Sequence, residues 1–202
     1  MVFTGEADML TNVTYAGLFR PSNRAYACFY DIALVIGGSL FIAVSSQLRI
    51  FLPISPVPIT GQTFAVLVTG ALYGARRGGL SVVLYIIMGM SGLRIFALGG
   101  GFSVLLGATG GYLLGFIAAA YVTGLLAERG WDRRIETTIL AMVFGNMVIY
   151  AFGLLWLCCL AGFSRTVLVM GLYPFIIGDL LKIVLAALLL PSGWKLLNRF
   201  TP

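Results

Sequence analysis

The sequence lacks histidine entirely, and Asp, Glu, Lys and Arg make up only 10% of its 202 residues. Without an imidazole, Ser–His hydrolysis, histidine proton relays and histidine metal sites are excluded. The three cysteines cannot form a zinc site alone, and Cys158 and Cys159 are neighbours in an apolar run. No G-x-x-x-x-G-K-[ST] motif occurs, so the chain does not hydrolyse ATP through a P-loop. We therefore expect no catalytic residue, no metal and no cofactor.

What the sequence has in excess is apolar surface. Hydrophobic residues make up 60% of the chain, and the mean hydropathy is +1.02. A soluble domain is roughly 45–50% apolar and about 25% charged. The chain is therefore predicted to be a multi-pass integral membrane protein. Its partner is the lipid bilayer, and its net charge of +6 does not indicate nucleic acid, because in a membrane chain the positions of the charges matter more than their sum.

Six apolar segments predict an all-α membrane domain with six transmembrane helices. They lie at about 29–48, 62–75, 79–93, 103–126, 137–161 and 172–191. The second and third are short, which leaves a re-entrant hairpin as an alternative to two crossings. A hairpin would place Arg76 and Arg77 in hydrocarbon, at roughly 2.5–3.5 kcal/mol each. Two short, buried crossings are the favoured interpretation.

The basic residues favour one orientation of these segments. Nine of the 13 Lys and Arg residues fall in the N-terminal stretch, in the loops after the second and fourth segments, and at the C-terminus; three fall in the opposite loops. By the positive-inside rule, both termini face the cytoplasm. Residues 1–28 are too polar to cross a membrane and lack the order of a signal peptide. We interpret them as a cytoplasmic tail before a membrane domain at 29–202.

Two connections on the outer side have unusual compositions. The loop at 49–62 contains three prolines, which fix the backbone and remove donors, so we expect it to be extended and stiff. The loop at 93–109 is apolar yet broken by glycines. Irregular apolar backbone near a bilayer must lie on protein or line a cavity. Both loops are predicted to cover a pocket that opens outward; the alternative is that they are simple connectors.

The strongest local feature is a charged pair inside the sixth segment. Asp179 and Lys182 lie in an apolar run, where ionised side chains are costly and usually functional. Their i, i+3 spacing places them on one helix face, where a carboxylate acceptor and an ammonium donor can share one pocket. The alternative is an ion pair that only locks helix packing, which is a poor route to stability.

Other residues are candidates for the lining of this pocket. Asn146 and Tyr150 are four apart on the fifth segment, where they either extend the lining or bond between helices. Gln62 and Thr63 begin the second segment, after the proline-rich loop, and either cap it or contact ligand. Arg94 is the cation of the glycine-rich loop, and either meets an anionic group or lies at the interface. An apolar wall is expected from aromatic residues: Phe96, Phe102, Tyr112 and Trp156.

The first segment carries the small residues Ala33 and Gly37 at helical spacing, which permits close contact with another helix. The residues alone leave open whether that helix belongs to this chain or to another subunit, with packing inside the chain as the first expectation. Together these features describe an outward pocket for a small, mostly apolar ligand with one or two polar ends.

Five motifs in order carry a family resemblance: PVPITGQTF (56–64), GATGGYLLGF (107–116), AERGWDRR (127–134), GNMVIYAFG (145–153) and PFIIGDLLK (174–182). From about residue 26 onward the chain resembles the BioY family, the biotin-specific substrate-binding (S) components of energy-coupling factor (ECF) transporters. The resemblance implies high-affinity capture of biotin outside a bacterial plasma membrane, and coupling to a scaffold membrane subunit and two ATPase subunits. It further implies that Asp179 and Lys182 engage the polar groups of biotin, and that Ala33 and Gly37 contact the scaffold.

Biotin matches the pocket described above, because its ureido ring has two N–H donors and one carbonyl acceptor, while its thioether ring and valeryl chain are apolar. Its carboxylate calls for a cation near the mouth, for which Arg94 is the candidate. Arg94 and Ala108 stand where the family usually has proline, so no role for Arg94 follows from the resemblance. The predicted substrate-binding set is Asp179, Lys182, Arg94, Asn146, Tyr150, Gln62, Thr109, Tyr112 and Phe96.

Other functions were weighed against this one. An S component for a different vitamin and a stand-alone small-molecule transporter remain alternatives. An intramembrane aspartyl protease needs two carboxylates within hydrogen-bond reach, and Asp31 begins the first segment at the end opposite to Asp179. A passive channel is disfavoured, because no segment shows a polar stripe along its whole length.

Overall fold

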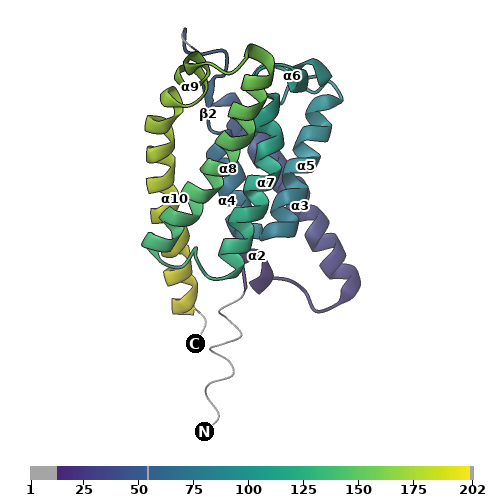
Figure 1. Ribbon diagram of the computed structural model, residues 1–202. Coiled ribbons are helices and arrows are strands. Elements are labelled where there is room, and N and C mark those ends of the chain that lie inside the picture. Colours follow the sequence, from purple (N-terminus) through teal and green to yellow (C-terminus); the bar gives the residue numbers. More distant parts are fainter. Residues whose placement is uncertain (1–12, 54, 201–202) are drawn as a thin grey trace.

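Six long helices account for the six apolar segments in the computed structural model, which describes residues 13–53 and 55–200 (Figure 1). They are α3 (Arg24–Gln47), α4 (Gln62–Tyr73), α5 (Ala75–Met90), α7 (Gly110–Glu128), α8 (Ile135–Ala161) and α10 (Tyr173–Phe200). The shorter elements are α2 (Tyr15–Leu18), α6 (Phe102–Leu106), α9 (Arg165–Gly171) and the strands β1 (Arg49–Ile50) and β2 (Ile59–Thr60). Helices dominate because each satisfies its own backbone hydrogen bonds, as a bilayer requires.

The surface of the bundle is apolar, as expected for a membrane protein. Four helical stretches are long and apolar enough to cross a bilayer, namely α3, α7, α8 and the α9–α10 run. Large apolar side chains are exposed on all four, for example Val44 on α3, Leu114 on α7, Met147 on α8 and Leu189 on α10. Such exposure is unfavourable in water and favourable against lipid tails, so the predicted helical membrane architecture is confirmed.

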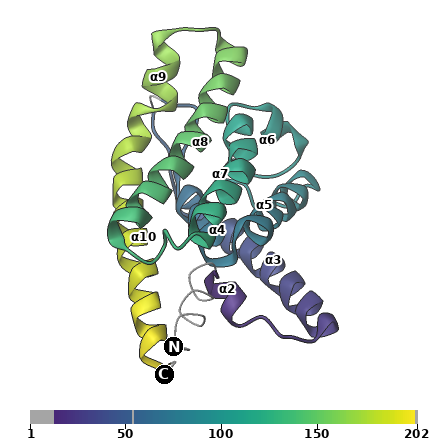
Figure 2. The ribbon, with the colours of Figure 1, turned by 60° about the horizontal axis from the view of Figure 1, so that its bottom comes forward.

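The helices pack around α7, which contacts α4, α5 and α8, while α3 covers α5 and α10 covers α8 and α4. Figure 2 shows that the N-terminal half of α3 projects away from the other helices. Glycine permits the closest approaches: a Cβ atom on Gly70 would lie 2.4 Å from the carbonyl oxygen of Ala120 on α7. The short helices α4 and α5 meet at Gly74, whose φ of +85° forms the turn between them. Eight of the 12 residues of α4 are buried, so this helix lies inside the bundle.

Some boundaries differ from those expected from hydropathy. Helix α3 already begins at Arg24, because the side chain of Asn23 accepts a hydrogen bond from the amide of Ala25 and caps the helix. The fourth segment is divided into α6 and α7, since glycines on either side of α6 interrupt the helix. Helix α10 continues through Pro191 to Phe200. Residues 1–12 of the predicted tail lie outside the described part of the chain.

The two ends of the bundle are built differently. At one end, β1 and β2 pair antiparallel, with Arg49 opposite Thr60, and close the proline-rich loop (Figure 1). The glycine-rich loop beside them folds back on itself through paired backbone bonds between Phe96 and Gly99. At the other end, α2 lies beneath the helices near the C-terminal part of α10 (Figure 1). The first of these ends contains the candidate site.

Candidate functional site

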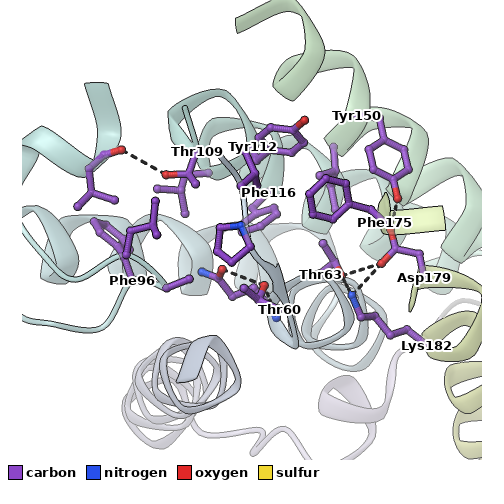
Figure 3. A pocket seen from close by; sticks show the side chains of 18 residues that line it. Thr60, Thr63, Phe96, Thr109, Tyr112, Phe116, Tyr150, Phe175, Asp179 and Lys182 are labelled. Carbon is purple, nitrogen blue, oxygen red and sulfur yellow. Dashed lines mark hydrogen bonds and ion pairs between the residues drawn. The ribbon is translucent and has the colours of Figure 1, made fainter. Parts of the chain in front are cut away.

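A pocket lies between α4, α7, α8, α10 and the two loops that were predicted to cover it. It encloses about 550 Å³, part of which is open to solvent. Its lining consists of Val57, Pro58, Thr60, Gln62, Thr63, Phe96, Ala97, Leu98, Val104, Thr109, Tyr112, Leu113, Phe116, Ile149, Tyr150, Phe175, Asp179 and Lys182. Figure 3 shows one polar cluster, Thr63, Tyr150, Asp179 and Lys182, on one side of this space, and Phe96 on the opposite side.

The polar side is organised around Asp179, which is only 4% exposed. Its Oδ1 atom accepts hydrogen bonds from Lys182 Nζ at 2.8 Å and from Thr63 Oγ1 at 3.2 Å. The hydroxyl of Tyr150 donates to Oδ2, and Lys182 Nζ also donates to Thr63 Oγ1 at 2.8 Å (Figure 3). Buried charges are tolerated when they are paired and hydrogen-bonded in this way. The cluster is neutral overall and presents a carboxylate beside an ammonium group.

Three helices bring these four side chains together. Asp179 and Lys182 are one helical turn apart on α10, so the i, i+3 prediction of a pair is confirmed. Thr63 lies in the first turn of α4, directly after the proline-rich loop, and Tyr150 lies on α8. Asp179 accepts three hydrogen bonds within the protein, whereas Lys182 donates two of its three N–H groups. A ligand with both a donor and an acceptor is therefore complementary to the pair.

The remaining wall is aromatic and aliphatic. Tyr112 and Phe175 lie 6.3 Å apart between ring centroids, and Phe116 lies beside them (Figure 3). The hydroxyl of Tyr112 donates to the carbonyl of Gly171 at 2.6 Å, which fixes its ring as part of the wall. The hydroxyl of Thr109 is also engaged within the protein, because it donates a hydrogen bond to the carbonyl of Val104 at 3.3 Å. The wall thus offers apolar contact and few free polar groups.

The predicted residue Gln62 lines the pocket, but its side chain is already engaged within the protein. Its Oε1 atom accepts a hydrogen bond from Thr60 Oγ1 at 3.0 Å, and its Nε2 atom donates to the hydroxyl of Tyr85 at 2.5 Å. With only 5% of the residue exposed, Gln62 forms part of the pocket floor. The amide is therefore held in one orientation before any ligand enters.

Two predicted residues lie away from the main pocket. Asn146 is buried and lines a second, smaller cavity, which shares Thr63 and Lys182 with the main pocket. Within residues 13–53 and 55–200 its Oδ1 atom has no hydrogen-bond partner. Arg94 is exposed and does not line the pocket. The structure therefore brings together seven of the nine predicted residues and separates these two from them.

Sequence reasoning did not select several lining residues. Phe116 follows Tyr112 by four positions on α7, and that spacing was a usable indication. Phe175 lies one turn before the predicted binding residue Asp179 on α10, so the same helical spacing indicated it. By contrast, Val57, Ala97 and Leu98 come from irregular loops. No periodic pattern identifies which loop side chains point inward.

Other predicted residues lie elsewhere in the bundle. Ala33 and Gly37 are exposed on α3, and a Cβ atom on Gly37 would meet only the hydroxyl of Tyr73, at 4.0 Å. Asp31 forms ion pairs with Arg77 at 2.7 Å and with Arg20 at 2.9 Å. Asp31 and Asp179 thus belong to separate ion pairs rather than to one dyad of the protease type.

Comparison with known proteins gives one consistent result. A protein of Rhizobium etli named biotin transporter BioY is 38% identical over 163 residues, covering 75% of this chain and 87% of that protein. A protein of Thermotoga maritima with the same name is 40% identical over 141 residues, covering 69% of this chain and 82% of its own length. A crystal structure described as the S-component for biotin from an ECF-type ABC transporter has the same fold. Its TM-score is 0.73 at 23% identity, and the match covers 87% of this chain and 95% of that one. The sequence model of the BioY family matches residues 19–199, and the chain belongs to this family.

Proposed function

We propose that the chain is the biotin-binding S component of an ECF-type transporter, a membrane transport protein and not an enzyme. The observation that supports this most directly is the buried Asp179–Lys182 pair at the polar side of an otherwise apolar pocket. Membership of the BioY family and the names of its relatives give the substrate class.

Each part of biotin has a counterpart in the pocket. The ureido N–H groups donate to the carboxylate of Asp179, and the ureido carbonyl accepts from the remaining N–H of Lys182. Hydrogen bonds of this kind to charged groups contribute about 1.5–3 kcal/mol each. The thioether ring and the valeryl chain lie against the aromatic wall of Tyr112, Phe116 and Phe175. Asn146 lines the second cavity together with Lys182 and makes no direct contact with biotin.

The carboxylate of biotin extends toward the outer loops. Arg94 is exposed on the glycine-rich loop and outside the pocket lining, so its guanidinium reaches that carboxylate only when the loop moves. The proposed role of Arg94 is therefore in closing the occupied pocket.

We further propose that all six long helices cross the plasma membrane, with both termini in the cytoplasm. Helix α2 and the C-terminal end of α10 lie at the end of the bundle opposite to the pocket (Figure 1). Nine basic residues cluster at that end and three at the other, which supports this orientation. The short helices α4 and α5 cross within the bundle, where protein replaces lipid around them. The pocket then opens outward.

Energy for uptake comes from partner subunits, because this chain has no P-loop. A scaffold membrane subunit and two ATPase subunits are the proposed partners. The small residues Ala33 and Gly37 are exposed on α3, where the backbone of another helix can approach closely. This face is the proposed contact with the scaffold.

Equilibrium binding of biotin to the purified chain in detergent, without ATP or other proteins, tests the proposal. We expect saturable binding of one biotin per chain, and no competition from thiamine or riboflavin at equal concentration. Competition by either vitamin would overturn the substrate assignment. Mass spectrometry of the small molecule that co-purifies with the chain would then identify the alternative ligand.

A further inference from the structure

Tyr85 of α5 is fully buried and does not line the pocket, yet its hydroxyl connects two parts of the pocket wall. It accepts a hydrogen bond from Gln62 Nε2 at 2.5 Å and donates one to the carbonyl of Ile95 at 3.1 Å. Gln62 belongs to the pocket floor, and Ile95 directly precedes the lining residues Phe96 and Ala97. A buried phenol hydroxyl that both accepts and donates is fully used, so its position is closely defined.

The glycine-rich loop is anchored at this point by further contacts. The carbonyl of Ile95 also accepts a hydrogen bond from the hydroxyl of Ser46, on α3. The ring of Phe96 packs edge-on against Tyr85, with centroids 5.4 Å apart and an interplanar angle of 82°. Phe96 also fills the space above Gly89, where a Cβ atom would lie 2.1 Å from the ring. The loop is thus held to the helices at this point by one carbonyl and one ring. It is also held by the amide of Gly101, which donates to the carbonyl of Gly89 at 2.8 Å, and by Arg49, which donates to the carbonyl of Ala97.

The same chain of hydrogen bonds reaches the proline-rich loop. Thr60, at the end of β2, donates to Gln62 Oε1 at 3.0 Å and accepts from the backbone amide of Gln62 at 3.2 Å. Both covering loops are therefore connected through Gln62 and Tyr85. A change at either loop is transmitted to the other through the side chain of Gln62, which is engaged within the protein, and through Tyr85, which lies outside the pocket lining.

We propose that Tyr85 is a positioning residue that latches the glycine-rich loop against the pocket and so sets the rate at which bound ligand escapes. The proposal rests on the biotin-binding function proposed above. Without the hydroxyl, Ile95 keeps only its bond to Ser46, and Gln62 Nε2 loses its acceptor in a buried site. The wall formed by Phe96 and Ala97 then opens more often.

The test compares ligand exchange and loop opening in Tyr85→Phe and the unmodified protein. We expect the dissociation rate of biotin to rise about three- to tenfold, which corresponds to the loss of about one buried hydrogen bond. The association rate should change less than about twofold, because the ligand contacts are intact. Amide hydrogen exchange in residues 93–101 should be faster in the ligand-free variant than in the ligand-free unmodified protein. When biotin is added to the variant, exchange should slow less in residues 93–101 than in the rest of the chain.

Two further variants make the result specific. Ser46→Ala removes the other bond to Ile95 and the contact of Ser46 with the Tyr85 hydroxyl, while the bonds of Tyr85 to Gln62 and to Ile95 are kept. It should also raise the dissociation rate and loop exchange. Tyr73→Phe is the matched control, because the hydroxyl of Tyr73 makes no hydrogen bond within residues 13–53 and 55–200; it should change neither rate. If Tyr85→Phe fails to fold, the dissociation rate and the loop exchange of Ser46→Ala decide whether the loop is latched at Ile95.

Failure of the latch and failure of the proposed function give different results. If the unmodified protein does not bind biotin, the proposed function is wrong, and the exchange of residues 93–101 in the ligand-free variants still tests the latch. If biotin binds but Tyr85→Phe leaves both the dissociation rate and loop exchange unchanged, the latch is overturned. A slower association rate with unchanged loop exchange would also overturn it, because Tyr85 would then act on the shape of the pocket.

Discussion

Two buried aspartates, one toward each end of the bundle, are held in different ways. Asp179 accepts three hydrogen bonds and is paired with the ammonium of Lys182. Asp132, in the loop between α7 and α8, is 1% exposed, and its Oδ2 atom accepts a hydrogen bond from Trp194 Nε1 at 2.6 Å. Among the residues that the structure describes, its Oδ1 atom has no partner. The carboxylate at the pocket end, which is the outer end in the proposed orientation, is compensated by charge. The carboxylate at the opposite, proposed inner end is enclosed mainly by packing.

The surroundings of Asp132 explain this difference. Trp194 packs against Tyr15 with ring centroids 4.5 Å apart, and the guanidinium of Arg133 lies 4.3 Å from its ring. These contacts join α2, the α7–α8 loop and the C-terminal part of α10. The inner end is thus closed by aromatic stacking, while the outer end keeps a solvent-accessible space with balanced charges. The comparison predicts that changes at the outer end alter ligand affinity, and that changes in the inner half alter coupling or stability.

The largest expected effect is on transport, from a substitution in the inner half. Gly37→Trp places a large side chain on the exposed face of α3, near the hydroxyl of Tyr73. Because close approach by the scaffold needs small residues, active uptake and co-purification with the scaffold should be lost. Biotin affinity should stay within about twofold, since the pocket is made by other helices. Uptake in cells and binding in detergent measure the two properties separately.

Leu189→Trp, on the exposed face of α10, is the matched control for a lipid-facing tryptophan. It should leave both uptake and binding intact. If Gly37→Trp instead loses biotin binding, this face packs within the bundle. If it keeps both properties, the coupling surface lies elsewhere or the chain transports alone.

The next largest effect is the removal of the outer carboxylate. Asp179→Asn loses a charge-assisted acceptor and leaves Lys182 without its partner in a buried site. Biotin affinity should fall at least about tenfold, since each 1.4 kcal/mol is a factor of ten. Isothermal titration of the purified variants measures this. Asp132→Asn neutralises the inner carboxylate and should leave affinity unchanged, so equal affinity in the two variants would contradict the comparison.

A smaller effect is expected when only one donor to Asp179 is removed. Tyr150→Phe deletes the hydroxyl that bonds to Oδ2 and leaves the bonds from Thr63 and Lys182. Affinity should fall by about three- to tenfold, less than for Asp179→Asn. Tyr121→Phe, on the exposed face of α7, is the control and should have no effect. A loss in Tyr150→Phe as large as in Asp179→Asn would mean that the cluster collapses as a unit.

The pair at the outer end was predictable because two charges stand out in an apolar run, where their placement is unfavourable without a function. That Thr63 and Tyr150 meet this pair was not predictable, because they lie on other helices and the sequence does not reveal how those helices cross. Asn146 and Tyr150 show the limit of spacing within one helix. One turn of about 5.4 Å separates them, which is enough to place Asn146 at the second cavity and Tyr150 in the main pocket.

The six apolar segments were predicted because runs of apolar residues mark the helices of a membrane protein, including α4, which lies inside the bundle. Their ends were less well predicted, since local groups decide them: Asn23 caps α3, and α10 continues through Pro191. The position of Arg94 illustrates a similar difficulty, because it depends on the fold of an irregular loop. The cluster around Asp132 was also missed, although Trp131 to Arg134 belong to one of the quoted motifs. Nothing in that motif shows that Trp194, far away in sequence, covers the carboxylate.

The smallest expected effect concerns the stability of the inner end. Burial raises the pKa of Asp132 from 3.8 to about 6, against the opposing influence of the Trp194 hydrogen bond and the nearby Arg133. Between about pH 4 and pH 6 the folded protein therefore keeps a proton that the unfolded chain has lost. The contribution of Asp132 to folding stability must fall as the pH rises through this window, and stay constant above about pH 7.

Asp132→Asn cannot titrate and still offers Trp194 an oxygen acceptor. The apparent Tm of the unmodified protein, measured in detergent at several pH values, should drop by a few degrees more than that of the variant between about pH 4.5 and pH 7.5. The difference between the two curves of Tm against pH cancels the effect of every other titrating group, because both proteins contain those groups. Parallel curves would mean that Asp132 is solvated in the folded protein, and the contrast between the two aspartates would then rest on geometry alone.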